Sequence, residues 1–169
     1  LEITATLSGD DAPTLHSLLD GCATAAGSRL LRQWLAQPLR AQARLAQRHD
    51  AIDALRGDPR AAQALAGALK RTVDVERVVG RIALANARPR DLAGLRDTLV
   101  KLPELAAGLA ALAVPLLAAA RTALAVDPQW AALLARAVAP EPAAMVRDGG
   151  VIASGFDAEL DELRAIDTH

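Results

Sequence analysis

The sequence is poor in cysteine and in aromatic residues. Its 169 residues include one cysteine, two tryptophans, one phenylalanine and no tyrosine. The lone Cys22 cannot form an internal disulfide, and the chain does not open with the pattern of a secretory leader, so we expect a reducing, cytoplasmic setting. Alternating β-branched residues are also scarce, whereas hydrophobic residues, mainly Ala, Leu and Val, make up 52% of the chain. This composition predicts an all-α fold.

Long hydrophobic runs are missing as well. The longest run, residues 105–120, contains Gly108 and Pro115, and it is shorter than the roughly 20 residues that a membrane-spanning helix needs. A chain of 169 residues fits one domain, and a domain of this size buries roughly 70% of the surface that its unfolded form exposes. We therefore predict a domain that needs no disulfides and has no membrane partner.

Charge is distributed unevenly along the chain, although the formal net charge is only −1. Residues 1–28 carry four acidic groups and no basic group, residues 29–101 carry 15 basic and 7 acidic groups, and residues 102–169 carry 4 basic and 9 acidic groups. The middle stretch could contact nucleic acid. However, its arginines recur at helical spacing opposite apolar stripes, and most such faces are simply solvated.

Turn signals and apolar periodicity divide the chain into helices. Asp58 before Pro59 and Asp127 before Pro128 both read as an N-cap followed by proline at the first helical position, and Asp74 is placed to cap the helix that follows it. Pro103 is expected to open a new apolar segment, which Pro115 divides or kinks. The predicted helices lie at 14–20, 22–37, 41–56 (buried face Leu45, Ile52, Leu55), 59–71, 75–83, 92–102, 103–125 and 128–137.

The two ends of the chain are predicted to differ in secondary structure. Residues 1–7 alternate apolar and polar side chains and favour a short strand or an extended lead-in, which could pair with an extended segment at 151–153. Residues 140–156 contain turn residues and read as a connector. An acidic helix then begins at Asp157, with Leu160, Leu163 and Ile166 on its apolar side. The sequence stops at His169 without a C-cap signal, which suggests an excised fragment.

Patterns that carry chemistry are mostly missing. A GxxxxGKS/T phosphate-binding loop is absent, and the histidines, His16, His49 and His169, are too scattered to form a metal site with Cys22. Neither Cys22 nor Ser154 has a recognisable histidine partner for nucleophilic catalysis. The acids Asp157, Glu159, Asp161 and Glu162 could hold a divalent cation, but acids in a first helical turn are better explained by the helix dipole. We expect no enzyme activity, cofactor or metal in this chain.

The most specific stretch is the helix within residues 24–39. Leu30, Leu31, Trp34 and Leu35 fall on one side of it, with Arg29, Arg32 and Gln33 toward the other. Pro38 is expected to end the helix. In a chain with so few aromatics, Trp34 is predicted to fill part of the core.

Four segments, in order along the chain, resemble the bacterial MutS family of DNA mismatch-repair proteins. The resemblance implies the first part of the family's core domain, domain III, which is an irregular bundle of helices. It further implies that residues 1–156 form this helical core and that residues 157–169 begin a lever helix, which leads toward a clamp domain absent from this chain. The four segments are LEITATLSG (1–9), TLHSLLDGCATAAGSRLLRQWLAQPLR (14–40), VERVVGRIALANARPRDLAGLRDTL (75–99) and DGGVIASGFDAELDELRAI (148–166).

The role that this resemblance implies is mechanical. The core and levers of the family relay between the clamping of mismatched DNA and the nucleotide state of a P-loop ATPase domain. ATP and Mg²⁺ would bind in that ATPase domain of the parent protein, not in this chain. The implied partners are the other domains of the parent, mismatched duplex DNA, a MutL-type protein and a second copy of the parent in a homodimer.

The residues that match the family's pattern have structural roles by this resemblance. Gly27 would permit close helix packing, and Trp34 and Pro38 would act as described above. Arg29 and Arg32 would either pair with acids elsewhere in the core or remain solvated. The complete set of matching positions is Gly27, Arg29, Leu30, Leu31, Arg32, Trp34, Leu35, Pro38, Leu39, Arg81 and Asp91.

Two alternative functions remain open from the sequence. One is a free-standing helical domain that binds protein partners. The other is a DNA-binding module that uses the basic stretch 29–101, which predicts salt-sensitive affinity for duplex DNA.

Overall fold

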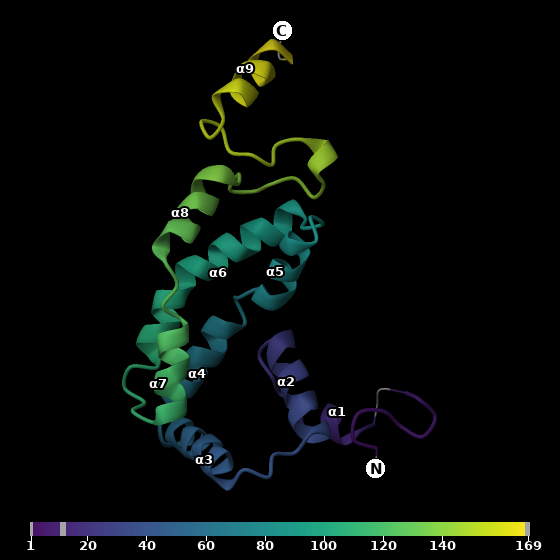
Figure 1. Ribbon diagram of the computed structural model, residues 1–169, viewed down its shortest axis with the longest axis vertical. Coiled ribbons are helices and arrows are strands. Elements are labelled where there is room, and N and C mark those ends of the chain that lie inside the picture. Colours follow the sequence, from purple (N-terminus) through teal and green to yellow (C-terminus); the bar gives the residue numbers. More distant parts are fainter. Residues whose placement is uncertain (1, 11–12, 168–169) are drawn as a thin grey trace. The chain divides into compact units, whose positions relative to one another are not determined.

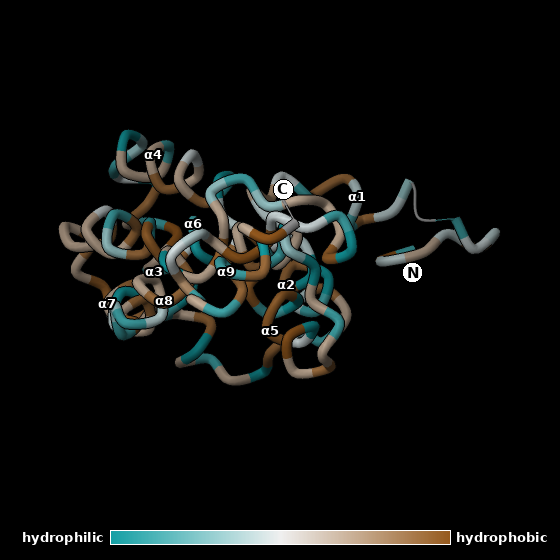
Figure 2. Tube along the Cα trace, turned by 90° about the horizontal axis from the view of Figure 1, so that it is seen from above, coloured by the Kyte–Doolittle hydropathy of each residue, from teal (hydrophilic) through white to brown (hydrophobic). Residues whose placement is uncertain are grey.

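The computed structural model describes residues 2–10 and 13–167, and within them the fold is all-α, as predicted (Figure 1). Hydrophobic and hydrophilic residues alternate along the helices (Figure 2), as expected for helices that bury one side. The α-helices are α1 (Leu15–Leu19), α2 (Ala25–Ala36), α3 (Gln42–Gly57), α4 (Pro59–Leu69), α5 (Val75–Ala83), α6 (Pro89–Gly108), α7 (Pro115–Ala123), α8 (Pro128–Ala137) and α9 (Ala158–Asp167), and a 3₁₀ helix, η1, spans Val146–Asp148.

The chain forms two compact units. Unit 1 comprises Leu1–Asp74 and Pro103–Leu124, and unit 2 comprises Val75–Leu102 and Ala125–His169. Helix α6 contributes its first part to unit 2 and its last turns to unit 1. The assignment of residues 1–156 to a core and 157–169 to a lever helix stays a prediction.

Short polar side chains fix where several helices begin. The predicted caps are confirmed at α4, where the Asp58 carboxylate accepts a hydrogen bond from the Ala61 amide at 3.0 Å, and at α8, where Asp127 accepts one from Gln129 at 2.9 Å. Thr14 and Thr24 cap α1 and α2 in the same way. These bonds satisfy amides that have no partner inside the helix.

The core of unit 1 is built by α3, α4 and α7 together with the end of α6. Helix α3 packs against both α4 and α7, and the buried residues are mainly Ala and Leu: Ala51, Ala68, Leu105, Leu109 and Leu112. The predicted buried face of α3 is partly wrong, because Ile52 is 49% exposed and Ala51 is buried instead. A small residue lets α3 approach its neighbours closely.

The core of unit 2 surrounds the first part of α6. Its buried residues include Val78, Ala93, Leu95, Thr98 and Val138. The apolar stripe predicted for α5 lies on a helix, as expected, but Val75, Val79 and Ile82 on that stripe remain substantially exposed.

The segment at 151–153 is extended, as predicted, but its predicted partner is wrong. Ile152 forms an antiparallel bridge with Val138, and the Ala139 amide donates to the Val151 carbonyl at 2.9 Å. Residues 2–10 form turns instead of a strand. Within them the Thr6 amide donates a hydrogen bond to the Asp10 carbonyl. Leu1 lies outside the described residues. The bridge to residue 138 is available because α8 ends just before it.

The two internal prolines of the apolar segment behave differently. Pro115 begins α7, so the predicted division of the segment there is confirmed. Pro103 does not open a new helix, because α6 runs through it without interruption to Gly108. The prediction of a break at Pro103 is therefore wrong. Proline weakens a helix without always ending it, and burial of Leu105 and Leu109 holds the last turns in place.

No helix within the described part of the chain is both long enough and apolar enough to cross a membrane.

Candidate functional site

The arginines of α2 are engaged with other parts of unit 1. The Arg29 guanidinium donates two hydrogen bonds to the Asp74 carboxylate, at 2.5 and 3.0 Å, just before α5 begins. Arg32 donates to the backbone carbonyl of Thr4 at 2.9 Å. The sequence left open whether these arginines pair with acids or remain solvated. Arg29 pairs with an acid, whereas Arg32 binds a backbone carbonyl. A two-pronged Arg–carboxylate pair fixes direction as well as distance.

Trp34 does not fill the core, so that prediction is wrong. Its side chain is 36% exposed, and the Arg48 guanidinium of α3 lies 3.5 Å from the centre of its ring. The geometry is that of a cation–π contact. Of the predicted apolar side of α2, Leu31 and Leu35 are half-buried, whereas Leu30 and Trp34 are exposed. Helical periodicity could not show that an arginine would lie over the Trp34 ring.

The other apolar signature positions on and after α2 are only partly covered. Leu30 is among the exposed hydrophobic residues, whereas Leu31, Leu35 and Leu39 are half-buried. Helix α2 ends at Ala36, ahead of Pro38, as predicted.

Gly27 is confined by its own helix start, not by a second helix. A Cβ atom at this position would lie 3.3 Å from the Thr24 hydroxyl and 3.4 Å from Cys22 Cβ. The Thr24 hydroxyl accepts a hydrogen bond from the Gly27 amide at 3.0 Å. The prediction that Gly27 permits close helix packing is therefore wrong, because its close neighbours are the N-cap residue of α2 and the turn before it.

Arg81 and Asp91, which matched the family pattern separately, meet in unit 2. Arg81 Nη1 lies 2.7 and 2.8 Å from the two carboxylate oxygens of Asp91. The same carboxylate accepts a hydrogen bond from the Arg88 amide at 2.9 Å. These bonds, from the Arg88 amide first and the Arg81 guanidinium second, hold the pKa of Asp91 below its ordinary value. The pair joins α5 to the first turn of α6 and closes the turn between them.

Two further arginines in unit 2 were missed by the sequence analysis. Arg96 on α6 donates to the carbonyls of Ala139 and Pro140, at 2.9 and 3.1 Å, and its side chain is only 14% exposed. Arg164 on α9 donates to the carbonyl of Ile152 at 3.0 Å. Both arginines satisfy backbone carbonyls of the connector that follows α8. Nothing in their local sequence could have predicted partners 12 or more residues away.

A cluster of polar side chains links α1 to the start of α2. His16 Nε2 lies 3.2 Å from the Ser28 carbonyl and 3.7 Å from the Asp20 carboxylate, and the Ser28 hydroxyl bonds directly to Asp20. Asp20 also accepts a hydrogen bond from the Cys22 amide. The Ser28 hydroxyl and Cys22 amide lower the pKa of Asp20, whereas burial and this carboxylate raise the pKa of the Cys22 thiol.

This cluster resembles a catalytic triad in composition but not in geometry. In a triad the acid binds the ring nitrogen opposite to the one that faces the serine. Here Asp20 and Ser28 approach the same nitrogen of His16, and Asp20 holds the serine hydroxyl itself. The raised thiol pKa also makes Cys22 a poor nucleophile. The cluster therefore acts as a connection between two helices.

The acids at the start of α9 are used in local bonds. Asp157 accepts a hydrogen bond from the Leu160 amide at 3.0 Å, and Asp161 accepts one from the Gly155 amide at 2.6 Å. Among the described residues, no three His, Cys, Asp or Glu side chains are arranged to hold a metal ion. The arrangement supports the interpretation of these acids as part of a helix start.

A comparison with known protein families gives a match that spans almost the whole chain. The family model of MutS domain III matches residues 1–167. The match confirms the resemblance seen in the sequence, and it assigns the chain a role in DNA mismatch repair. Among the residues that carry the resemblance, Gly27 lies in the first turn of α2, and Arg29, Arg81 and Asp91 form ion pairs.

Proposed function

Because the chain belongs to the family of MutS domain III, we propose that it is the structural core of a mismatch-repair protein and relays between DNA clamping and nucleotide state. The match over residues 1–167 carries this proposal. The role requires a body that moves as a unit, since a force applied at one end of a soft body would be absorbed inside it.

The contacts of the signature residues support this role. Arg29 on α2 pairs with Asp74, the residue that precedes α5, and Arg81 on α5 pairs with Asp91 in the first turn of α6. Such pairs resist rotation of the joined segments because both oxygens of the carboxylate are engaged. Within the described residues, none of these side chains forms a nucleophile–base arrangement.

The partners proposed for this core follow from the same family. They are the other domains of a MutS protein, mismatched duplex DNA, a MutL-type protein and a second MutS copy. ATP and Mg²⁺ would be bound by a separate ATPase domain of that protein, which supplies the hydrolysis.

The proposal can be tested in a MutS-family protein that carries this domain. Asp74→Asn should leave mismatch affinity and basal ATP hydrolysis within about threefold of wild type, which is less than 1 kcal/mol. The change in DNA affinity that ATP causes should become smaller. Asp50→Asn on the exposed side of α3 serves as the matched control. Unchanged coupling in Asp74→Asn, with the ion pair lost, would refute a relay through this contact.

The rival DNA-binding function is weakened by the contacts that arginines of the basic stretch make. Arg29, Arg71 and Arg81 each pair with a carboxylate on a different segment. The charge of such an arginine is already partly neutralised, so it attracts DNA phosphates less strongly. Fluorescence anisotropy of this chain alone with a labelled duplex at low salt distinguishes the two functions. Salt-sensitive binding would favour the DNA-binding module, and the relay proposal predicts none.

A further inference from the structure

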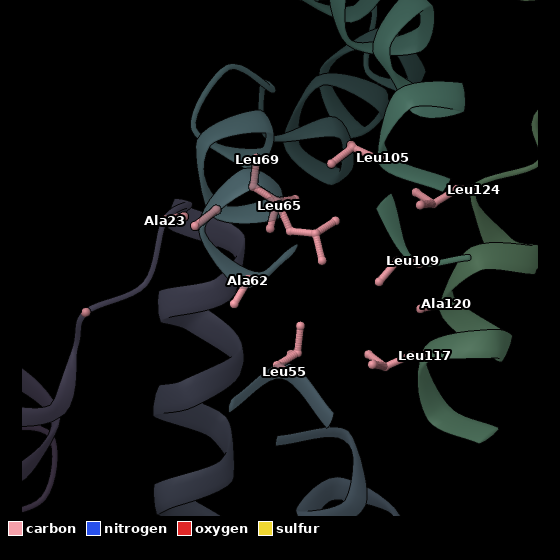
Figure 3. A pocket seen from close by; sticks show the side chains of 12 residues that line it. Ala23, Leu55, Ala62, Leu65, Leu69, Leu105, Leu109, Leu117, Ala120 and Leu124 are labelled. Atoms are coloured by element: carbon pink, nitrogen blue, oxygen red, sulfur yellow. The ribbon is translucent and has the colours of Figure 1, made fainter. Parts of the chain in front are cut away.

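Unit 1 contains an aliphatic hollow of about 450 Å³, which we call the unit 1 hollow (Figure 3). Leu55 of α3, Leu65 of α4 and Leu117 of α7 extend toward it from three sides. The buried Leu105 and Leu109 of α6 line it as well. Side chains from segments that are distant in sequence therefore converge on one space inside a single unit.

The chemistry of the lining restricts what the hollow can hold. The described residues that line it are all Gly, Ala or Leu, so they offer no side-chain hydrogen-bond donor or acceptor. A polar or charged group that entered would lose its hydrogen bonds to water without replacement, which is costly. Apolar surface gains free energy when it leaves water for such a lining. An occupant must therefore be uncharged and consist mainly of hydrocarbon.

Close packing around the hollow keeps its walls apart. A Cβ atom at Gly108, the last residue of α6, would lie 3.0 Å from Leu65 Cδ2 of α4, so the end of α6 already touches α4. Helix α3 packs against both α4 and α7. The hollow therefore does not close by an approach of α4 to α6, and it is largely preformed, as ligand pockets usually are.

The volume of the hollow favours a small molecule over a protein segment. One turn of an α-helix is about 5.4 Å long and about 10 Å wide, so it occupies about 400 Å³. The hollow has room for about one such turn, and an isolated turn is not a stable helix. An extended segment would bring backbone amides and carbonyls that this lining cannot pair. Pockets for small molecules, in contrast, have volumes of about 300–1,000 Å³.

We propose that the unit 1 hollow is a binding site for an uncharged small molecule that consists mainly of hydrocarbon. An aliphatic space of this kind takes up apolar molecules because no polar group is left unpaired by their transfer from water. The unfolded chain has no such hollow, so the ligand binds the folded chain alone and stabilises it. This inference does not depend on the proposed relay function.

The first experiment uses N-phenyl-1-naphthylamine, an uncharged aromatic compound whose fluorescence rises when it leaves water. Wild type should bind this probe saturably, with a dissociation constant between about 1 and 100 μM. The thermal midpoint of the chain should rise with probe concentration. The sulfonated analogue, 8-anilinonaphthalene-1-sulfonate, has the same rings and a negative charge. It should bind at least about tenfold more weakly, because the lining cannot pair its sulfonate.

Two substitutions on facing helices fill the hollow. Ala66→Phe on α4 with Ala120→Phe on α7 adds two rings at lining positions, and this filled variant should bind the probe at least about tenfold more weakly than wild type. The matched control is Ala64→Phe with Ala119→Phe, which adds the same rings to the same helices at exposed positions outside the lining. The control should retain the wild-type affinity within about twofold, and circular dichroism checks that both variants are folded.

A local signal shows where the probe binds in wild type, so the test does not depend on the folding of the filled variant. Cys22 is the single cysteine of the chain, it is exposed, and its neighbours Gly21 and Ala23 both line the hollow. A trifluoroethyl group attached to its sulfur can be followed by ¹⁹F NMR. The ¹⁹F signal should shift as the probe saturates the chain, and the half-point of the shift should agree with the fluorescence titration.

Four results would overturn the proposal. The first is a wild type that does not bind the probe below about 1 mM, and the second is equal affinity for the probe and its sulfonated analogue. The third is saturable binding that leaves the ¹⁹F signal unchanged or persists undiminished in a folded filled variant. The fourth is a probe affinity that falls as the concentration of the chain rises, because a second copy of the chain would then be the occupant.

Discussion

At the scale of single residues, two carboxylates each accept hydrogen bonds from two different segments. Asp91 accepts from Arg81 and from the Arg88 amide, and Asp20 accepts from Ser28 and from Cys22. Each of these carboxylates therefore fixes a turn as well as a pair. Removing the charge leaves donors that no neutral group of the same shape can satisfy equally well.

The first prediction concerns Asp91. Asp91→Asn should lower the free energy of unfolding by about 1 to 2 kcal/mol, because it weakens two charge-assisted bonds, one of them to a partly exposed arginine. Urea denaturation followed by circular dichroism measures this change. Asp148→Asn, whose contact is with the adjacent and exposed Arg147, should change stability by less than about 0.5 kcal/mol.

Acid stability gives the second prediction. Asp20 and Asp91 have lower pKa values in the folded chain than in the unfolded one. As the pH falls, these groups bind protons in the unfolded chain before they do so in the folded chain. Their contribution to the free energy of unfolding is complete well above pH about 4, and it is lost as the pH falls through the folded pKa. The urea midpoint should therefore fall between about pH 5 and pH 3. Asp20→Asn with Asp91→Asn should have a flatter profile, and an equal slope in both proteins would contradict this cause.

Trp34 provides the third prediction. A fully buried aromatic residue costs roughly 3 to 5 kcal/mol when replaced by alanine. Because Trp34 is 36% exposed and packs on Arg48, Trp34→Ala should cost only about 2 kcal/mol. Trp130→Ala, at a more exposed site, should cost less. A loss for Trp34→Ala as large as that of a buried aromatic would mean that its ring is covered in solution.

At the scale of helices, most starts could be predicted because they depend on neighbours in sequence. The pairs Asp58–Pro59 and Asp127–Pro128 contain both the capping group and the first helical residue, and the structure has both helices where the pairs place them. The break at Pro103 was predicted by the same local logic and was wrong. There the outcome depends on Leu105 and Leu109, whose burial is a property of the folded unit.

Helix α6 gives the fourth prediction. Pro103 lies inside it and has no amide hydrogen to donate to the carbonyl four residues earlier. Pro103→Ala should restore that bond and stabilise the chain by about 1 to 3 kcal/mol, reduced by the extra freedom of the unfolded chain. Thermal unfolding at neutral pH measures the gain. Pro115→Ala, at the first turn of α7, should bring no comparable gain because no helical bond is missing there.

Partners that are distant in sequence could not be predicted. The sequence identified residues 151–153 as extended, but the choice of Val138 as their partner depends on where α8 ends in space. Arg81 and Asp91 each matched a family position, yet a spacing of ten residues does not indicate an ion pair. The apolar stripes of α2, α5 and α9 were correctly periodic, but periodicity does not show how far each stripe is covered.

At the scale of the whole molecule, the chain joins two compact units that are each held by ion pairs and by modest aliphatic cores. The family match assigns it to mismatch repair. Under the proposed relay function, the signature residues should influence the coupling between DNA clamping and nucleotide state more than either activity alone.

The most direct test measures that coupling in a MutS-family protein that carries this domain. The ratio of mismatched-DNA dissociation constants with and without ATP is determined for wild type, Asp74→Asn, Asp91→Asn and the double variant. Coupling energies in proteins are typically about 1 to 3 kcal/mol, so loss of both ion pairs should bring the ratio several-fold closer to one, while basal hydrolysis and mismatch affinity stay near wild type. A folded double variant with the wild-type ratio would contradict the account.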